Sequence, residues 1–222
     1  MIQLENVSFL YPDGTPALSD ITYDFEMGRC YCISGPNGCG KSTLFRVLNG
    51  LSFVTSGAYT LDGQPVTEKA MKDRTFSAAF HRKIGYIMQN TDVQLFTRSV
   101  EEEIAFGLYQ MGLPDEEVEE RVSRYIKLLD LETLRKKSPF RLSGGEKKRT
   151  ALAAVLAMEP PVLIMDEPLN SLDEDGQQWI TRFIEDLKGP DRLLIVATHN
   201  RELTGAIGDT VIQMTKDHTF AL

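Results

Sequence analysis

Four short runs of apolar residues occur in the chain without alternating with polar positions. They span Arg29–Ser34, Ile84–Met88, Val162–Met165 and Leu193–Ala197. Unbroken apolar runs of this length are typical of strands that are buried on both faces, as in a parallel sheet. Between these runs lie segments whose apolar residues recur every three or four positions, the clearest being 116–131 and 175–187. Strands that alternate with helices predict an α/β fold with a mostly parallel sheet.

Two regions depart from this alternation. Residues 1–25 and 56–62 carry turn signals at Pro12-Asp13-Gly14 and Asp62-Gly63, and predict an N-terminal antiparallel β subdomain. Residues from about 90 to 150 are nearly all helical in pattern, which favours an α-helical subdomain inserted between two strands. The 222 residues therefore predict a single domain, in which 1–89 and 160–222 form the core with its antiparallel β part and 90–159 form the helical part.

Composition and charge argue against several classes of function. The chain has 32 acidic and 24 basic residues and a net charge of −8, whereas a nucleic-acid-binding protein needs the opposite sign or a basic stripe. No apolar run approaches the ~18 residues that a membrane-spanning helix requires, so direct membrane insertion is not expected. The first residues contain neither a basic leader nor an apolar signal core, which favours a cytoplasmic protein. The cysteines lack the spacing of a metal site and are expected as reduced thiols at Cys30, Cys32 and Cys39.

A phosphate-binding loop follows the first apolar run. Residues Gly35 to Ser42 read GPNGCGKS, which fits the pattern G-x-x-x-x-G-K-[S/T], and a helix-prone segment follows at once. Glycines let backbone N–H groups turn toward an anion, and the start of the helix adds a partial positive charge. Lys41 is expected near the β- and γ-phosphates, and the hydroxyl of Ser42 is a candidate Mg²⁺ ligand. The predicted ATP-binding residues of this loop are Asn37, Gly38, Cys39, Gly40, Lys41, Ser42 and Thr43.

A second, acidic element ends the third apolar run. Asp166 closes the predicted strand and Glu167 follows it directly. A carboxylate in the middle of the core would be very costly, so Asp166 is expected at the strand end, where it can approach Mg²⁺. Glu167 is then suitably placed to polarise a water molecule that attacks the γ-phosphate.

The segment Leu142-Ser143-Gly144-Gly145-Glu146 lies between these two elements and, together with them, closely resembles the signature of ATP-binding cassette (ABC) ATPases. The resemblance covers essentially the whole chain and implies a P-loop NTPase core. It also implies that Tyr11 stacks on adenine, that Gln89 senses Mg²⁺ and contacts a membrane partner, and that His199 contacts the γ-phosphate. The implied catalytic residues are Lys41, Gln89, Glu167 and His199, and the implied Mg²⁺ ligands are Ser42, Gln89 and Asp166.

The signature segment also implies a partner. It opens a predicted helix, whose free N–H groups and serine hydroxyl suit an anion. In ABC ATPases this surface completes the site of a second subunit, so that two ATP molecules lie between two cassettes. The resemblance therefore implies a homodimer or heterodimer in which Ser143 and Gly145 reach the nucleotide of the other subunit. ATP binding would close the dimer, and loss of the γ-phosphate would open it.

A narrower resemblance lies in the segments QNTDVQLF, from Gln89, and SVEEEIAFG. They are similar to the ATPase subunits of energy-coupling-factor importers and of related cobalt, nickel and biotin systems. Two interpretations of the aromatic residues Phe106 and Tyr109 stay open. Either both pack inside the helical subdomain, or they line a groove with Leu95 and Phe96 for a coupling helix of a membrane subunit.

The sequence thus predicts the ATP-binding and ATP-hydrolysing subunit of an ABC transporter, peripheral on the inner face of the cell membrane. It would couple dimer closure to solute import through a separate transmembrane subunit. The alternatives are an ABC ATPase without a transport function, a P-loop kinase or transferase, and a catalytically silent regulatory cassette. The chain has no long coiled-coil insert, second cassette or basic arms, which argues against the first alternative. The signature argues against the second, and intact Glu167 and His199 argue against the third. Cys39 is either a neutral filler of the loop or a reactive thiol.

Overall fold

The computed structural model describes residues 1–221 as two sheets surrounded by helices. The strands of the first sheet are β1 (Ile2–Leu10), β2 (Pro16–Phe25), β4 (Ser56–Leu61) and β5 (Gln64–Pro65). The strands of the second sheet are β3 (Cys30–Ser34), β6 (Ile84–Ile87), β7 (Val162–Asp166), β8 (Leu193–Ala197), β9 (Thr210–Met214) and β10 (Phe220–Ala221). The first sheet is antiparallel in the order β2-β1-β4-β5, and the second has the order β10-β9-β3-β8-β7-β6. The predicted α/β class and the N-terminal antiparallel sheet are confirmed.

The second, central sheet is parallel from β6 to β9, and β10 pairs antiparallel with β9. Its inner strands are buried on both faces. In β7, Val162 and Ile164 pack into one apolar core, whereas Leu163 and Met165 pack into the other. Because neither face of such a strand meets water, β7 is apolar at four successive positions, and its one polar residue is Asp166 at the carboxyl end.

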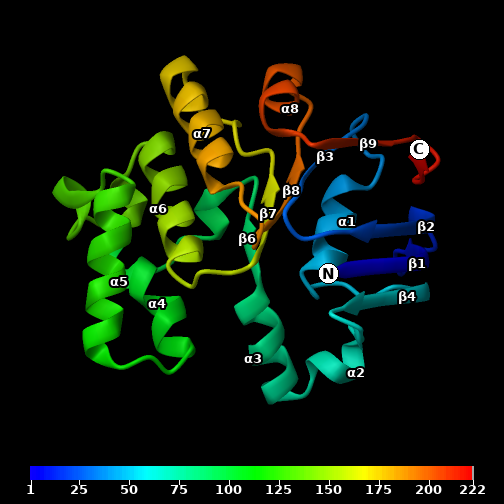
Figure 1. The fold of residues 1–222 in the computed structure, drawn as a ribbon, viewed down its shortest axis with the longest axis horizontal. Helices are drawn as coiled ribbons and strands as arrows, with labels where there is room; N and C mark the ends of the chain where they lie inside the picture. Colours follow the sequence, from blue (N-terminus) through cyan, green and yellow to red (C-terminus); the bar gives the residue numbers. More distant parts are fainter. Residues whose placement is uncertain (222) are drawn as a thin grey trace.

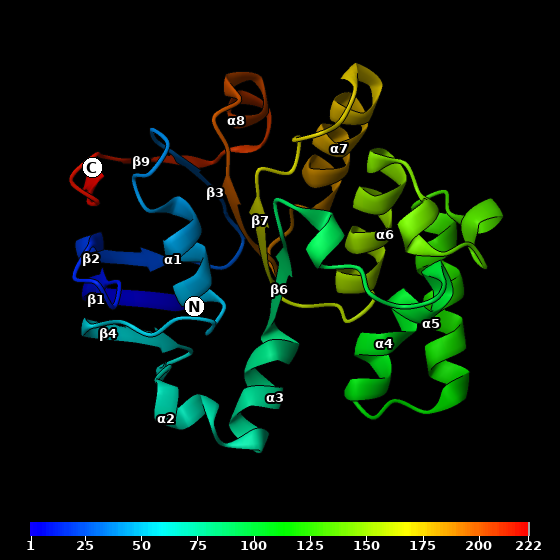
Figure 2. The ribbon, with the colours of Figure 1, turned by 180° about the vertical axis from the view of Figure 1, so that it is seen from behind.

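The helices of the structure pack against the sheets or against one another. They are α1 (Lys41–Leu48), α2 (Glu68–Met71), α3 (Arg74–Lys83), α4 (Val100–Gln110), α5 (Asp115–Leu128), α6 (Gly144–Leu156), α7 (Glu174–Leu187) and α8 (Arg201–Ile207), with 3₁₀ turns at Thr91–Val93, Glu132–Leu134 and Pro139–Arg141. Figure 1 shows the antiparallel sheet and helices α4 to α6 at opposite ends of the long axis, with the central sheet between them. Figure 2 shows the same arrangement from behind. Among the described residues 1–221, no helix is both long and apolar enough to span a membrane.

The helical end of the molecule follows the predicted pattern. The residues Val100, Ile104 and Leu108 of α4 are fully buried against the neighbouring helices. Helix α5 buries the face that recurs every three or four positions, namely Val118, Val122, Tyr125 and Ile126. The predicted helical region is therefore confirmed, while its division from the core at residues 89/90 and 159/160 stays a prediction.

Candidate active site

The loop between β3 and α1 is a tight turn that only glycines allow at key points. Gly38 and Gly40 have φ angles of 81° and 108°, a region that glycine adopts without steric cost. A Cβ atom at Gly40 would lie 2.1 Å from the carbonyl oxygen of Ala17, so no larger residue fits there. The loop is therefore held closely against β2, and it leads directly into the N-terminus of α1, which favours bound anions.

Two polar side chains at the start of α1 face this loop and the end of β7. Nζ of Lys41 donates hydrogen bonds to the carbonyl oxygens of Gly35, at 2.9 Å, and Pro36, at 3.2 Å, so the ammonium group folds back over the loop. Oγ of Ser42 donates to Oδ2 of Asp166 at 3.2 Å. A hydroxyl and a carboxylate thus meet at one point, as two oxygen ligands of one cation would.

The carboxyl ends of β7 and β8 carry two acids and a histidine. Asp166 is 4% exposed, and burial raises its pKa; the charge of Glu167 acts in the same direction, while the hydrogen bond from Ser42 opposes it. Glu167 has a left-handed φ of 46°, and its Oε1 lies 2.9 Å from Nδ1 of His199. Because an ionised carboxylate only accepts hydrogen bonds, Nδ1 of His199 donates. The histidine therefore fixes the direction of the Glu167 carboxylate.

Most of the predicted site residues surround one cavity of about 390 Å³. Its lining includes Tyr11, Asn37, Gly38, Gly40, Lys41, Ser42, Thr43, Gln89, Asp166 and Glu167. The hydroxyl of Tyr11 shares a hydrogen bond with Oγ1 of Thr43 at 2.8 Å, which holds the aromatic ring against the start of α1. His199 meets this set through its contact with Glu167.

Cys39 is placed differently from its neighbours in the loop. Its side chain is 2% exposed and belongs to the apolar core under the loop, and its N–H donates to the carbonyl oxygen of Pro36 at 3.3 Å. This burial favours the neutral filler over the reactive thiol. The sequence analysis missed His218, which also lines the cavity. No local pattern marks it, because it comes from the far end of the chain.

The predicted signature residues lie apart from this cavity. Ser143 caps α6: its Oγ accepts from the N–H of Glu146 at 3.4 Å, and the Glu146 carboxylate accepts from the N–H of Ser143 at 2.6 Å. Ser143 and Gly145 line a second cavity of about 580 Å³ together with Leu172 and Asp173. Among the described residues, those of the phosphate loop line only the first of these two cavities. One chain therefore holds two separate surfaces suited to phosphate.

Comparison with known proteins identifies the family. The family model described as ABC transporter matches residues 18–170, more than half of the chain. The chain belongs to the ABC transporter family. The nickel import ATP-binding protein LarO of Lactiplantibacillus plantarum is 44% identical to the cassette over 218 residues, which cover 98% of this chain and 90% of that protein.

Two solved structures share the fold of the cassette. CbiO1 from Clostridium perfringens, part of the ABC transporter complex CbiONQ, matches with a TM-score of 0.86 and 35% identity over 100% of this chain and 86% of that chain. The ATP-binding cassette MJ0796, in a dimeric post-hydrolysis state bound to ADP and Pi, matches with a TM-score of 0.88 and 27% identity over 100% of this chain and 97% of that chain. The predicted ATP-hydrolysing cassette of an ABC transporter is confirmed, and the kinase or transferase alternative is set aside.

The oxygen donors of the cassette fit Mg²⁺ that arrives with a nucleotide. Within residues 1–221, no group of three or more His, Cys, Asp or Glu side chains could hold a metal ion by itself. The hydroxyl of Ser42 and the carboxylate of Asp166 instead offer two ligands, and Gln89 lines the same cavity. Mg²⁺ commonly binds through one or two protein oxygens, with phosphate oxygens and water filling its other positions.

An aromatic groove lies at the helical end of the cassette. This groove has a volume of about 480 Å³, and its lining comprises Thr97, Glu101, Glu102, Ala105, Phe106, Tyr109, Val118, Glu119, Val122 and Lys136. Phe106 is 44% exposed and Tyr109 is 53% exposed, and Phe96, 58% exposed, packs edge-on against Phe106 with ring centroids 4.9 Å apart. The aromatic residues thus face solvent, contrary to the interpretation that they pack inside the subdomain. Leu95 is only 4% exposed, so its predicted place in the groove is wrong. Phe96 does not line the groove either, but it extends the exposed aromatic surface through its contact with Phe106.

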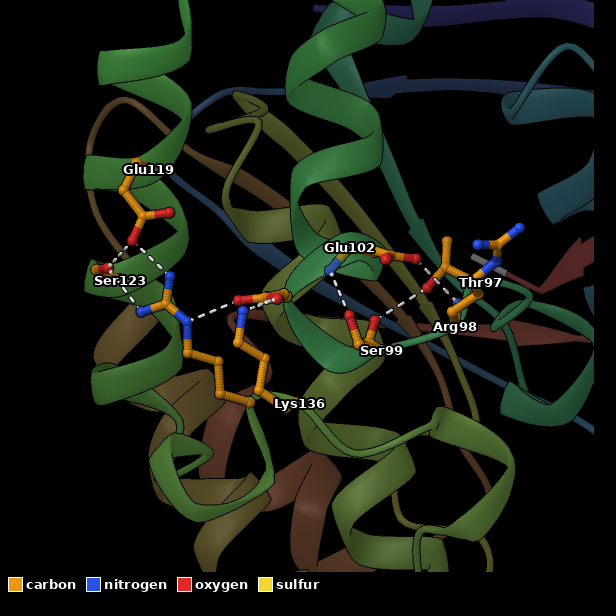
Figure 3. A network of polar contacts seen from close by, with 9 residues as sticks. Thr97, Arg98, Ser99, Glu102, Glu119, Ser123 and Lys136 are labelled. Carbon is orange, nitrogen blue, oxygen red and sulfur yellow. Dashed lines mark hydrogen bonds and ion pairs between the residues drawn. The ribbon is translucent and has the colours of Figure 1, made fainter.

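Polar contacts fix the walls of this aromatic groove. Glu103 is 5% exposed, and its Oε2 accepts hydrogen bonds from the N–H groups of Phe96, at 3.0 Å, and Thr97, at 2.9 Å, and from the Thr97 hydroxyl, at 2.8 Å. A further network lies beside the groove: Lys136 and Arg135 pair with Glu101, and Arg135 also pairs with Glu119. Figure 3 shows this region, with Lys136, Glu119 and Ser123 labelled. The segment that carries Phe96 is therefore tied to α4 by a buried carboxylate.

A buried ammonium lies on the signature helix. Lys148 of α6 is 3% exposed, and its Nζ has no hydrogen-bond partner within residues 1–221. Burial lowers the pKa of Lys148, while the charge of Asp166 opposes this shift. The same ammonium favours the ionised form of Asp166. The buried charge of Lys148 thus destabilises the fold, but it favours the ionised carboxylate of Asp166 in the active site.

We expect Lys148→Met to raise the free energy of unfolding at pH 7 by about 1–3 kcal/mol, the cost of an unsatisfied buried polar group. The pKa of Lys148 in the folded chain lies below its usual 10.5, so between these two values the unfolded chain binds more protons. The parent is therefore expected to gain stability as the pH rises through that window, and the variant to lack this gain. Urea unfolding at pH 7 and pH 10 measures both effects, with the exposed Lys127→Met as control. A less stable Lys148→Met variant would contradict the assignment.

Proposed function

We propose that this cassette is the ATP-binding and ATP-hydrolysing subunit of an importer of the energy-coupling-factor type. It would move a metal ion or a vitamin through a separate transmembrane subunit, from the inner face of the cell membrane. The observation that carries the proposal is that one chain holds a phosphate loop with two acids in one cavity and the signature residues in another. The name of LarO, a nickel import protein, supports an importer, and CbiO1, which is part of an ABC transporter complex, supports work together with other subunits.

The first cavity would bind ATP as follows. The backbone N–H groups of residues 38–43 and the ammonium of Lys41 hold the phosphates, and Tyr11 stacks on adenine. Ser42 and Gln89 would ligate Mg²⁺, and Asp166 would approach it. When bound, Mg²⁺ would neutralise phosphate charge. The Ser42–Asp166 contact supports this assignment because it places two oxygen donors at one point.

Glu167 and His199 would act on the water that attacks the γ-phosphate. The Glu167 carboxylate orients this water or takes its proton, and the hydrogen bond from Nδ1 of His199 holds the carboxylate in place. Nδ1 of His199 is engaged in this contact, so Nε2 is the nitrogen available to the γ-phosphate. Catalysis would rest mainly on positioning and electrostatic stabilisation.

Each site would be completed by a second cassette, in a homodimer or a heterodimer. Ser143 and Gly145 at the start of α6 would cap the terminal phosphate of the ATP held by the partner. The separate cavities of the two surfaces support this, since residues that bind the same nucleotide in one chain would line one cavity. Closure would follow ATP binding, and opening would follow the loss of the γ-phosphate.

The aromatic groove would receive a helix of the transmembrane subunit. Its exposed aromatic residues offer apolar contact area to such a helix. The chain segment 89–96 connects the two sites: Gln89 lines the nucleotide cavity, and Phe96 packs against Phe106 of the groove. Movement at the nucleotide could therefore be transmitted to the membrane subunit.

We expect the double variant Phe96→Ser and Phe106→Ser to lose capture of the membrane subunit while ATP still binds, because the aromatic contact area at the groove is removed. The tagged cassette is purified from detergent extracts of the cells that naturally express it. The transmembrane protein that co-purifies is then identified and quantified by mass spectrometry. Val211→Ser, which removes an apolar residue that is 53% exposed on β9, is the matched control. Normal co-purification of the double variant would refute the groove assignment. Absence of any transmembrane protein with the parent would refute the transport proposal itself.

A further inference from the structure

The turn between β9 and β10 brings His218 against the phosphate loop. The carbonyl oxygen of His218 accepts a hydrogen bond from the N–H of Ser19 at 3.0 Å, which ties the turn to β2. Nδ1 of its ring lies 3.2 Å from the carbonyl oxygen of Cys39, in the middle of the phosphate loop. His218 lines the same cavity as Tyr11 and Pro16. A residue from the last strands is thus part of the nucleotide cavity.

The contact with Cys39 determines which ring nitrogen carries the proton. A backbone carbonyl only accepts hydrogen bonds, so Nδ1 of His218 must donate. In the neutral imidazole, Nε2 is then left with a lone pair and can only accept. Within residues 1–221, the hydrogen bonds of the structure do not engage this Nε2. The hydrogen bond to the phosphate loop therefore sets the tautomer of the neutral His218 imidazole, in which Nε2 is a hydrogen-bond acceptor.

The backbone at His218 determines which variant can test the residue. Its φ is 64°, in the left-handed region that it shares with seven other non-glycine residues of the described chain. A glycine meets no steric penalty from a side chain in this region. Exchange for glycine therefore removes the imidazole and keeps the turn.

We propose that His218 is a further nucleotide-binding residue of the cassette, whose Nε2 accepts a hydrogen bond from a donor on the nucleoside part of ATP. Such donors are the two ribose hydroxyls and the 6-amino group of adenine. Tyr11 lines the same cavity, and the turn that carries His218 is tied to β2, so the nucleoside would lie between the two ends of the chain. This inference rests on the proposed ATP site.

The test compares the parent with His218→Gly, which keeps the left-handed backbone and so preserves the turn. Affinities are titrated for ATP, 2′-deoxy-ATP, 3′-deoxy-ATP, inosine triphosphate and tripolyphosphate, and thermal unfolding checks the fold. We expect His218→Gly to bind ATP about 2- to 10-fold more weakly, as one neutral hydrogen bond implies, and tripolyphosphate as well as the parent does. The difference in affinity between the parent and His218→Gly should vanish with one analogue only, the one that lacks the donor. That analogue identifies the donor as the 2′-hydroxyl, the 3′-hydroxyl or the 6-amino group. His81→Ala on α3, whose histidine does not line the cavity, is the control and should bind ATP like the parent.

Three results would overturn the inference. They are equal ATP affinity of parent and His218→Gly, an equal loss with tripolyphosphate, and a loss that persists with every nucleotide analogue. In each case the parent still binds ATP, so the proposed function stands. A parent that binds no ATP would instead overturn the proposed function.

Discussion

Exchange of Glu167 for glutamine is expected to slow ATP turnover by about 10²- to 10⁴-fold, the range typical of general-base catalysis, while ATP still binds. Glutamine preserves the length of the side chain, and its amide oxygen can accept the hydrogen bond that Nδ1 of His199 makes at 2.9 Å. The variant therefore keeps the geometry of the site and loses the negative charge that polarises the attacking water. Phosphate release at saturating ATP and Mg²⁺ measures the turnover.

The same variant is expected to accumulate as a closed dimer in ATP, because the γ-phosphate that bridges the two cassettes is no longer removed. Size-exclusion chromatography with light scattering gives the mass of the particle with and without ATP. Glu120→Gln, which neutralises an exposed glutamate of α5, is the matched control and should behave like the parent. Phosphate release at the parental rate by Glu167→Gln would contradict the catalytic assignment.

Lys41→Ala is expected to weaken ATP binding roughly 10- to 140-fold, since a hydrogen bond to a charged group is worth about 1.5–3 kcal/mol. The ammonium lies over the loop, where it donates hydrogen bonds to the carbonyl oxygens of Gly35 and Pro36. Because alanine removes the ammonium and leaves the backbone of the loop unchanged, the loss should appear mainly as weaker ATP binding.

Titration with a fluorescent ATP analogue measures this effect. Lys72→Ala removes an exposed lysine that pairs with Glu68 far along the chain from the loop, and it should leave the affinity unchanged. Adenosine affinity provides an internal comparison, because the ammonium acts on phosphates and not on the base. Unchanged ATP affinity of Lys41→Ala would refute its role.

The elements that the sequence predicted are those whose signals are local. The strands β3, β7 and β8 are buried on both faces, so every residue in them is apolar except Ser34 and Asp166 at the carboxyl ends of β3 and β7. Strand β9 was missed because Val211 faces solvent while Ile212 and Met214 are buried, which leaves an alternating pattern of only five residues. Helix α3 was missed because Phe80 is its only buried residue among mostly polar neighbours.

The residues of the candidate site likewise fall into those with a local sequence signal and those without one. The phosphate loop and the pair Asp166-Glu167 are contiguous motifs, and the geometry of each follows from the strand that precedes it. His218 and Lys148 depend instead on contacts between segments distant in the sequence, and no spacing rule connects His218 to Cys39. Leu95 was misplaced because its neighbour Phe96 is exposed, and the sequence does not tell which of two adjacent apolar residues points inward.

The buried carboxylate of Glu103 has a consequence for how the cassette meets another protein. It accepts hydrogen bonds from the backbone N–H groups of Phe96 and Thr97 and a third from the hydroxyl of Thr97, all within the cassette itself. Ordering a loose loop costs about 1–2 kcal/mol of conformational entropy per residue, and here folding has already met that cost. A subunit that docks at this segment would find it rigid, so that repeated movement in a working cycle would be transmitted rather than absorbed.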